Sequence, residues 1–145
     1  MKLSEHFTLE ELTASEIAAR KGLDNTPTEA EVANLIRLAA FLEQVRALLN
    51  KPILINSAFR SEAVNNAVGS KDTSQHRKGC AADIRVPGMT PKEVCTKIVQ
   101  SKLHYDQVIC EFDSWTHVSI PNKPEIGPRK VALVIDKNGT RSFEV

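Results

Sequence analysis

Two short polar segments, far apart in the sequence, set the strictest condition on the fold of this chain. Residues 74–83 carry His76 and, seven positions later, Asp83, and residues 115–119 carry His117. Two imidazoles and one carboxylate are the usual protein ligands of a catalytic zinc ion, whose fourth position is left for water. A fold that brings these three side chains together would hold a metal ion, so the pattern predicts a reaction as well as a structure.

The size and composition of the chain are typical of one globular domain, which we expect to span residues 1–145. Of the 145 residues, 41% are hydrophobic and 26% are charged. A chain of this length buries roughly two thirds of its unfolded surface and needs no disulfides to fold. The net charge is only +1. A dedicated nucleic-acid-binding protein normally has a stronger basic excess, so we expect no nucleic-acid partner.

The three cysteines, Cys80, Cys95 and Cys110, include no Cys-x-x-Cys pair. Their odd number excludes a complete disulfide framework, and their spacing argues against a cysteine zinc site. We therefore interpret them as buried, reduced thiols.

The amino-terminal residues and the hydropathy pattern bear on where the protein is made. Residues 1–6 lack the apolar core of a signal peptide. No apolar run approaches the roughly 20 residues of a membrane span. We expect a monomer that is made in the cytoplasm, stays there until something releases it, and has no stable membrane association.

Capping boxes predict three helix starts. The first, at residues 8–11, opens a short helix that should end before Gly22. The second, at residues 26–29, places Pro27 at the first helical position, and the third lies at residues 90–93. Apolar residues at helical spacing after the second box predict a long amphipathic helix with this stripe: Val32, Leu35, Ile36, Ala39, Leu42, Val45 and Leu49.

The middle of the chain predicts a strand, a helix and a loop before the first metal-ligand candidate. Residues 52–57 are typical of a buried strand, and residues 61–68 of a short helix stopped by Gly69. Residues 69–79 then form a polar loop that carries His76.

Alternating residues predict the remaining strands. In residues 81–86 the polar side of the strand presents Asp83, and the apolar side packs on the core. Residues 105–112 and 115–120 predict a hairpin, and a second hairpin follows from residue 131 to the end of the chain. This order predicts an α+β fold, with helices packed on one side of a small, mostly antiparallel sheet.

Five segments together resemble the zinc D-Ala-D-Ala carboxypeptidase-like family of murein peptidases, in its phage and prophage branch. They are Ser-x-His-x-x-Gly-x-Ala-x-Asp at residues 74–83, Trp-x-His-x-Ser at 115–119, and the segments 57–61, 105–112 and 3–12. The resemblance covers nearly the whole chain and implies the Hedgehog/DD-peptidase fold.

The resemblance implies a role for five residues. His76, Asp83 and His117 would bind one zinc ion. Arg60 matches the family's arginine, which neutralises a substrate carboxylate or polarises the scissile carbonyl; the alternative is a salt-bridged surface arginine. Ser74 matches a serine that donates a hydrogen bond to the substrate; the alternative is a hydroxyl that caps the loop.

The general base is not fixed by the resemblance. Some branches of the family place an acid three residues before the last histidine, where this chain has Ser114. Glu111 occupies the family's Glu-Phe position and is our choice, with Asp113 as the alternative. A two-residue turn would put Glu111 on the face away from His117, whereas a three-residue loop would bring it opposite His117.

The resemblance also implies a reaction: cleavage of a peptide bond in the stem or cross-link of peptidoglycan by a metal-activated water. We expect an endolysin that reaches the cell wall after a holin opens the membrane. A virion-associated lysin and a D-Ala-D-Ala carboxypeptidase are alternatives within the family. A non-catalytic zinc-binding module, as in the signalling domain of Hedgehog proteins, is the alternative from another class.

Overall fold

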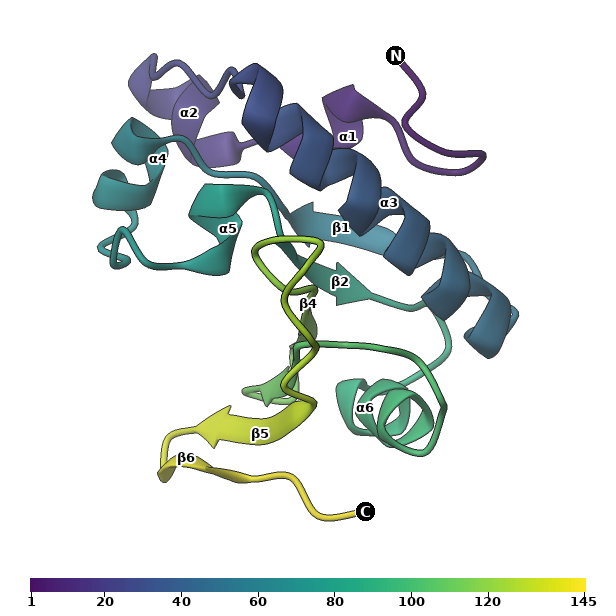
Figure 1. Cartoon of the computed structure of the whole chain (residues 1–145). Helices are drawn as coiled ribbons and strands as arrows, with labels where there is room; N and C mark the ends of the chain where they lie inside the picture. The colour runs from purple at the N-terminus through teal and green to yellow at the C-terminus, as the bar shows by residue number, and fades with distance from the viewer.

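A computed structural model describes residues 1–145, which form one six-stranded sheet with helices around it (Figure 1). The strands, in chain order, are β1 Leu54–Ser57, β2 Ala81–Arg85, β3 Gln107–Glu111, β4 Trp115–Ser119, β5 Val131–Asp136 and β6 Gly139–Ser142. Their order in the sheet is β1-β2-β4-β3-β5-β6. Every pair is antiparallel except β3–β5, which is parallel. The predicted α+β class is confirmed, with one parallel pair in a mostly antiparallel sheet.

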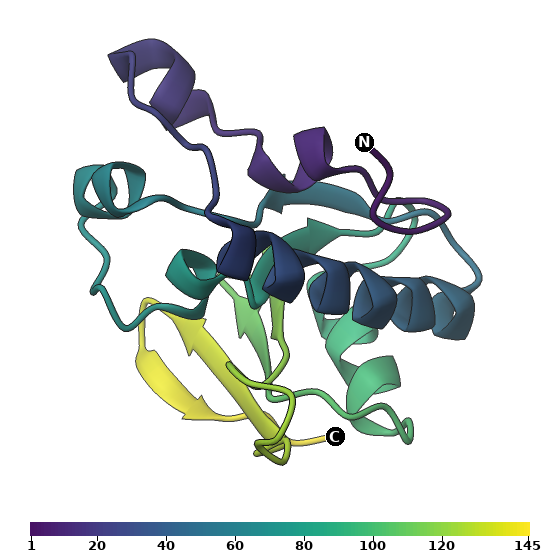
Figure 2. The same ribbon diagram turned by 45° about the horizontal axis from the view of Figure 1, so that its top comes forward.

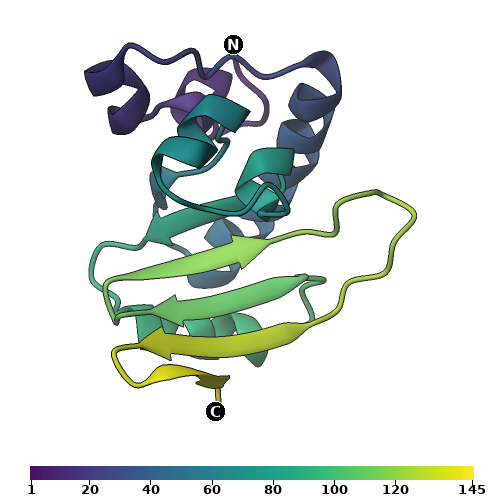
Figure 3. The same ribbon diagram turned by 90° about the vertical axis from the view of Figure 1, so that its left-hand side faces the viewer.

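The helices are α1 Leu9–Thr13, α2 Glu16–Lys21, α3 Glu29–Leu49, α4 Glu62–Ala67, α5 Gln75–Lys78 and α6 Pro91–Val99. Helices α3 and α6 lie together on one face of the sheet, whereas α1 contacts both α3 and the edge strand β1, and α2 contacts α4 (Figure 2). The short helices α4 and α5 lie near β2 on the other side, so not all helices pack on one face (Figure 3). None of the helices is both long enough and apolar enough to cross a membrane.

The main core lies between α3, α6 and the sheet. Helix α3 buries a wider side than its predicted stripe, because both α1 and α6 contact it. Leu38 and Phe41, which the stripe omitted, are buried, whereas Ile36 is 47% exposed. From the sheet, the core receives the even-numbered side of the strands, which includes Ala82, Ile84, Val108, Cys110 and Val118.

Two predicted helix boundaries are wrong. The first helix is divided, because Ala14 leaves the helical conformation and Ser15 caps a new helix by accepting a hydrogen bond from the Ala18 N–H. The long helix begins at Glu29 and not at Pro27, because the capping box is formed by Thr28 and Glu31.

Two predictions in the middle of the chain also need correction. β1 is an edge strand that pairs only with β2, so Leu54 is 46% exposed and the strand is not buried. The predicted polar loop contains the one-turn helix α5, which Ser74 caps and Gly79 ends with φ +78°. A Cβ at Gly79 would lie 3.0 Å from the Glu31 carbonyl oxygen, so this close approach to α3 requires glycine.

The turn between β3 and β4 has three residues, because Glu111 pairs with Trp115. Phe112 and Asp113 both adopt the left-handed conformation, with φ 54° and 48°. This conformation is costly for residues other than glycine, least so for Asp and Asn, so the turn stores backbone strain at the end of the sheet.

Candidate metal centre

The three predicted ligands meet on the odd-numbered face of the sheet, which we call the metal face. The register of β2 and β4 places Asp83 directly opposite His117. Helix α5 holds His76 over the same two strands, and α3 and α6 leave this face uncovered (Figure 3). Thus one strand pair and one helical turn bring together residues that are 41 positions apart in the sequence (117 − 76).

The distances within the cluster suit a metal ion. Oδ1 of Asp83 lies 3.1 Å from Nδ1 of His117 and 3.3 Å from Nε2 of His76. One donor atom from each residue lies within 4.8 Å of the others. A tetrahedral zinc ion with bonds of about 2.0–2.1 Å separates neighbouring ligand atoms by about 3.3 Å. The nitrogen and oxygen donors and their spacing therefore fit zinc.

The His76 ring is oriented by a backbone group outside the cluster. Nδ1 of His76 lies 2.7 Å from the Ala58 carbonyl oxygen. Because a carbonyl only accepts, this nitrogen carries the proton and Nε2 is free to bind a metal. Such a hydrogen bond to the second nitrogen is a regular feature of metal-binding histidines. The sequence carried no signal for this contact, since any residue offers a carbonyl.

The carboxylate of Asp83 remains ionised inside this buried cluster. Burial opposes its charge, but hydrogen bonds from His117 and His76 hold the pKa of Asp83 far below its usual range. A carboxylate must be ionised to bind a metal, so the two histidines favour the form of Asp83 that could bind one.

Arg60 and Glu111 lie within the electrostatic field of the cluster. Burial lowers the pKa of Arg60, while the charges of Asp83 and Glu111 raise it. Arg60 makes no ion pair within 4.0 Å; its one side-chain hydrogen bond is to Asn65 Oδ1 at 3.4 Å. It is half-buried, so it does not have the salt-bridged surface position considered as its alternative.

The β3–β4 turn decides which face Glu111 occupies. With a three-residue loop, Glu111 stands opposite Trp115 and shares the metal face with His117, while Ile109 is the residue directly opposite His117. Burial first, and then the charge of Asp83, raise the pKa of Glu111. Asp113 instead faces a hollow on the other side of the sheet.

Ser74 and Trp115 have clear structural positions. The Ser74 hydroxyl oxygen accepts a hydrogen bond from the His76 N–H at 3.2 Å, which is the capping alternative. The indole nitrogen of Trp115 is buried without a partner at good hydrogen-bond geometry. It lies near enough to Glu111 to favour the ionised carboxylate, although burial outweighs this effect.

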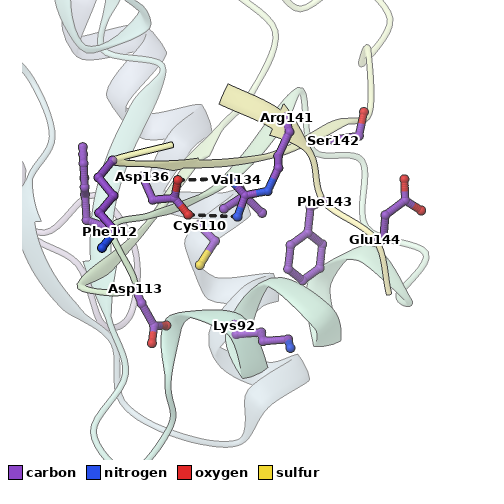
Figure 4. A pocket seen from close by; sticks show the side chains of 11 residues that line it. Lys92, Cys110, Phe112, Asp113, Val134, Asp136, Arg141, Ser142, Phe143 and Glu144 are labelled. Carbon is purple, nitrogen blue, oxygen red and sulfur yellow. Dashed lines mark hydrogen bonds and ion pairs between the residues drawn. The ribbon is translucent and has the colours of Figure 1, made fainter. Parts of the chain in front are cut away.

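Hollows in the surface lie on both sides of the sheet. The largest, of about 650 Å³, is on the core side between α6 and the last hairpin, and has Cys110, Val134 and Phe143 among its lining residues (Figure 4). It therefore does not include the metal cluster. A smaller hollow of about 290 Å³ lies beside Arg60, between α2, β1 and α4.

A histidine–aspartate–histidine cluster of this geometry could hold a metal ion with one coordination position left for water, as catalytic zinc sites do, whereas a closed structural site has a fourth protein ligand. The family model described as peptidase M15 matches residues 5–119. The chain therefore belongs to the peptidase M15 family, which consists of zinc-dependent metallopeptidases. No curated protein matches the chain.

Proposed function

We propose that this protein is a zinc-dependent peptidase that cleaves a peptide bond of bacterial peptidoglycan, in the stem peptide or the cross-link. The observation that carries the proposal is the convergence of His76, Asp83 and His117 beside Glu111 on one uncovered sheet face. These three side chains would hold the ion. When bound, zinc supplies a Lewis acid that lowers the pKa of a water molecule toward neutrality and polarises a carbonyl.

Glu111 is proposed as the general base. Its carboxylate would accept a proton from the attacking water and later pass it to the leaving amine. The raised pKa of Glu111 suits both steps, because a base that binds its proton too weakly could not return it. Asp113 is the weaker candidate, since it faces the opposite side of the sheet.

Arg60 and Ser74 are proposed to bind the substrate. The guanidinium of Arg60 has no ion-pair partner and can neutralise a substrate carboxylate or the charge that grows on the carbonyl oxygen. The Ser74 oxygen caps α5 as an acceptor, which leaves its hydroxyl hydrogen free to be donated. Capping and substrate binding are thus compatible roles of one hydroxyl.

The open metal face supports an endopeptidase. Beyond Trp115 and Glu111, the face continues over β5 and β6 without a covering helix, so a peptide chain could extend on both sides of the scissile bond (Figure 3). A D-Ala-D-Ala carboxypeptidase is the second candidate. The hollow beside Arg60 favours it, because a terminal residue with a free carboxylate could end there.

The biological setting follows as part of the proposal. We propose a phage or prophage endolysin that is made in the cytoplasm and acts on the wall after release through a holin-opened membrane. The amino-terminal segment 3–12, which resembles the phage branch, supports this setting. A virion-associated lysin would instead be found in purified particles, which mass spectrometry of those particles would detect.

The test is release of peptides from purified peptidoglycan by the metal-loaded and the chelator-treated protein, read by mass spectrometry. We expect release only with metal, and the fragment masses identify the bond that is cleaved. Binding of one zinc ion per chain without release of any peptide would contradict the proposal and favour a non-catalytic zinc-binding module.

A further inference from the structure

A buried polar network adjoins the metal centre without touching the metal-ligand side chains. Nε2 of Gln75 lies 3.0 Å from Asp106 Oδ2, from the Ile120 carbonyl oxygen and from Asn122 Oδ1. The amide has two hydrogens to donate, so these three acceptors share them. Gln75 and Asp106 are 9% and 2% exposed, so this network is part of the protein interior.

Arg129 balances the buried charge of Asp106. Its Nε lies 3.1 Å from both carboxylate oxygens, its Nη2 lies 2.6 Å from Oδ2, and its backbone N–H donates to Oδ1. Burial opposes ionisation of Asp106, but the hydrogen bonds from Arg129 and Gln75 keep its pKa below the usual range. Asp106 is therefore a fixed, charged anchor to which Gln75 is bound.

The position of Gln75 gives this anchor its importance. Gln75 directly precedes His76 in α5, a helix of only four residues. A single helical turn has too few internal hydrogen bonds to be stable alone and depends on contacts with its surroundings. At the carboxyl-terminal end of α5, Arg77 forms an ion pair with Glu31 of α3. Asn34 of α3 donates a hydrogen bond to the Lys78 carbonyl oxygen at 2.9 Å. The turn that carries His76 is thus held from both sides.

The contacts of Gln75 lead to the strand that carries the second histidine. Ile120 lies three residues after His117, and Asp106 lies one residue before β3 and donates its N–H to Ser119 of β4 at 2.8 Å. Cys80 and Ile120 are joined by a further backbone hydrogen bond of 2.9 Å. Gln75 therefore connects the helix of one metal ligand to the end of the strand of another.

We infer that Gln75 and Asp106 are positioning residues of the metal centre, which fix the distance between His76 and His117 through hydrogen bonds outside the metal-ligand shell. The inference rests on the proposed metal-dependent function. It predicts that loss of the Gln75 amide changes the geometry and affinity of the metal site, in addition to any effect on folding.

The chain offers a matched control in the last hairpin. Asp136 accepts hydrogen bonds from Arg141 Nη1 and Nη2 at 3.0 Å and 2.8 Å, and from the Asn138 N–H at 2.9 Å (Figure 4). This aspartate–arginine pair resembles that of Asp106 and Arg129 but lies on the core side of the sheet, away from the metal face. Asp136→Asn removes a similar pair without reaching α5.

The experiment compares Gln75→Met, Asp106→Asn and Asp136→Asn with the unchanged protein. Methionine has nearly the length of glutamine but donates no hydrogen bond, so Gln75→Met is the variant that should fold if Asp106→Asn does not. Zinc affinity is measured by competition with a chelator. The visible absorption spectrum of the cobalt-substituted protein reports the geometry of the ligands, and thermal unfolding of the metal-free protein reports stability.

We expect Gln75→Met and Asp106→Asn to weaken zinc binding about tenfold, as outer-shell changes in metal sites do, and to alter the cobalt spectrum. Asp136→Asn should change neither readout. If Gln75→Met is less stable but keeps the affinity and spectrum of the unchanged protein, the network is merely structural and the inference is wrong. If the unchanged protein binds no metal, the proposed function fails first, and this inference fails with it.

Discussion

The two ends of the metal face are supported in opposite ways. At one end, His76 lies on a helical turn that buried hydrogen bonds and an ion pair hold to the sheet and to α3. At the other end, Glu111 precedes a turn with two left-handed residues, in which Phe112 is 53% exposed. We call the metal-binding end, which these contacts hold in place, the rigid end, and the end with the proposed base, which has the left-handed turn and is more exposed, the strained end.

The largest effect should come from the rigid end. His117→Ala removes one of three protein ligands, so we expect the bound metal to fall from one ion per chain to nearly none and peptidoglycan cleavage to become undetectable. Metal analysis of the purified variant after dialysis checks the first result. A variant that still holds a full ion would show that the three residues do not act as one site.

At the strained end, Glu111→Gln should separate metal binding from catalysis. We expect a loss of about 10²–10⁴-fold in kcat, the usual contribution of a general base, with zinc affinity little changed. Asp113→Asn is the matched control and should retain activity. The reverse pattern would assign the base to Asp113.

The raised pKa of Glu111 also predicts the pH dependence. Because the base must be ionised, activity falls as the pH drops through its pKa, and this fall should occur above the ordinary glutamate value of about 4.3. The residual activity of Glu111→Gln should lack the part of the acidic limb that Glu111 causes and keep only the part caused by protonation of the metal ligands, which a pH profile of kcat/KM would reveal.

An intermediate effect on stability is expected for the rigid end. The pKa of Asp106 is lowered in the folded protein, so its stabilisation is complete above the ordinary aspartate value of about 3.9 and is lost as the pH falls through the folded value. Asp106→Asn should cost about 2 kcal/mol at neutral pH, less than a fully buried pair, because Arg129 is 56% exposed. Urea unfolding at neutral and acidic pH measures the free energy of unfolding of the unchanged protein and of Asp106→Asn. A difference between the two that does not shrink in acid would contradict this account.

The smallest effect concerns the strained turn. At an ordinary position, glycine makes a protein less stable than alanine does. At position 112, where the backbone is left-handed, we expect the Phe112→Gly protein to be more stable than the Phe112→Ala protein by about 1 kcal/mol. Both variants lose the aromatic ring, so the pair isolates the backbone. Equal stabilities would show that the turn is not strained.

Prediction from sequence succeeded where local patterns suffice. Alternation in residues 81–86 and 115–119 predicted that Asp83 and His117 each lie on the polar side of their own strand, and the register of β2 and β4 places these two residues opposite each other. It failed where distant contacts decide: α5 is too short to have a periodic signal, and the parallel pairing of β3 with β5 depends on the whole sheet. The face of Glu111 depended on one residue in a turn, and the roles of Gln75 and Asp106 appear only when three segments meet.

The last hairpin determines which strand edge the sheet presents at this end. Residues 131–142 lie beyond the matched range 5–119, yet β5 covers the hydrogen-bonding edge of β3, a central strand with apolar residues. Without the hairpin, β3 would present an unpaired edge to other chains, a known route to aggregation. The outer strand β6 is short, exposed throughout and carries Arg141, which makes it a poor template for further strands. The hairpin therefore replaces the edge of an apolar strand with a short, polar edge strand that is less able to pair with other chains.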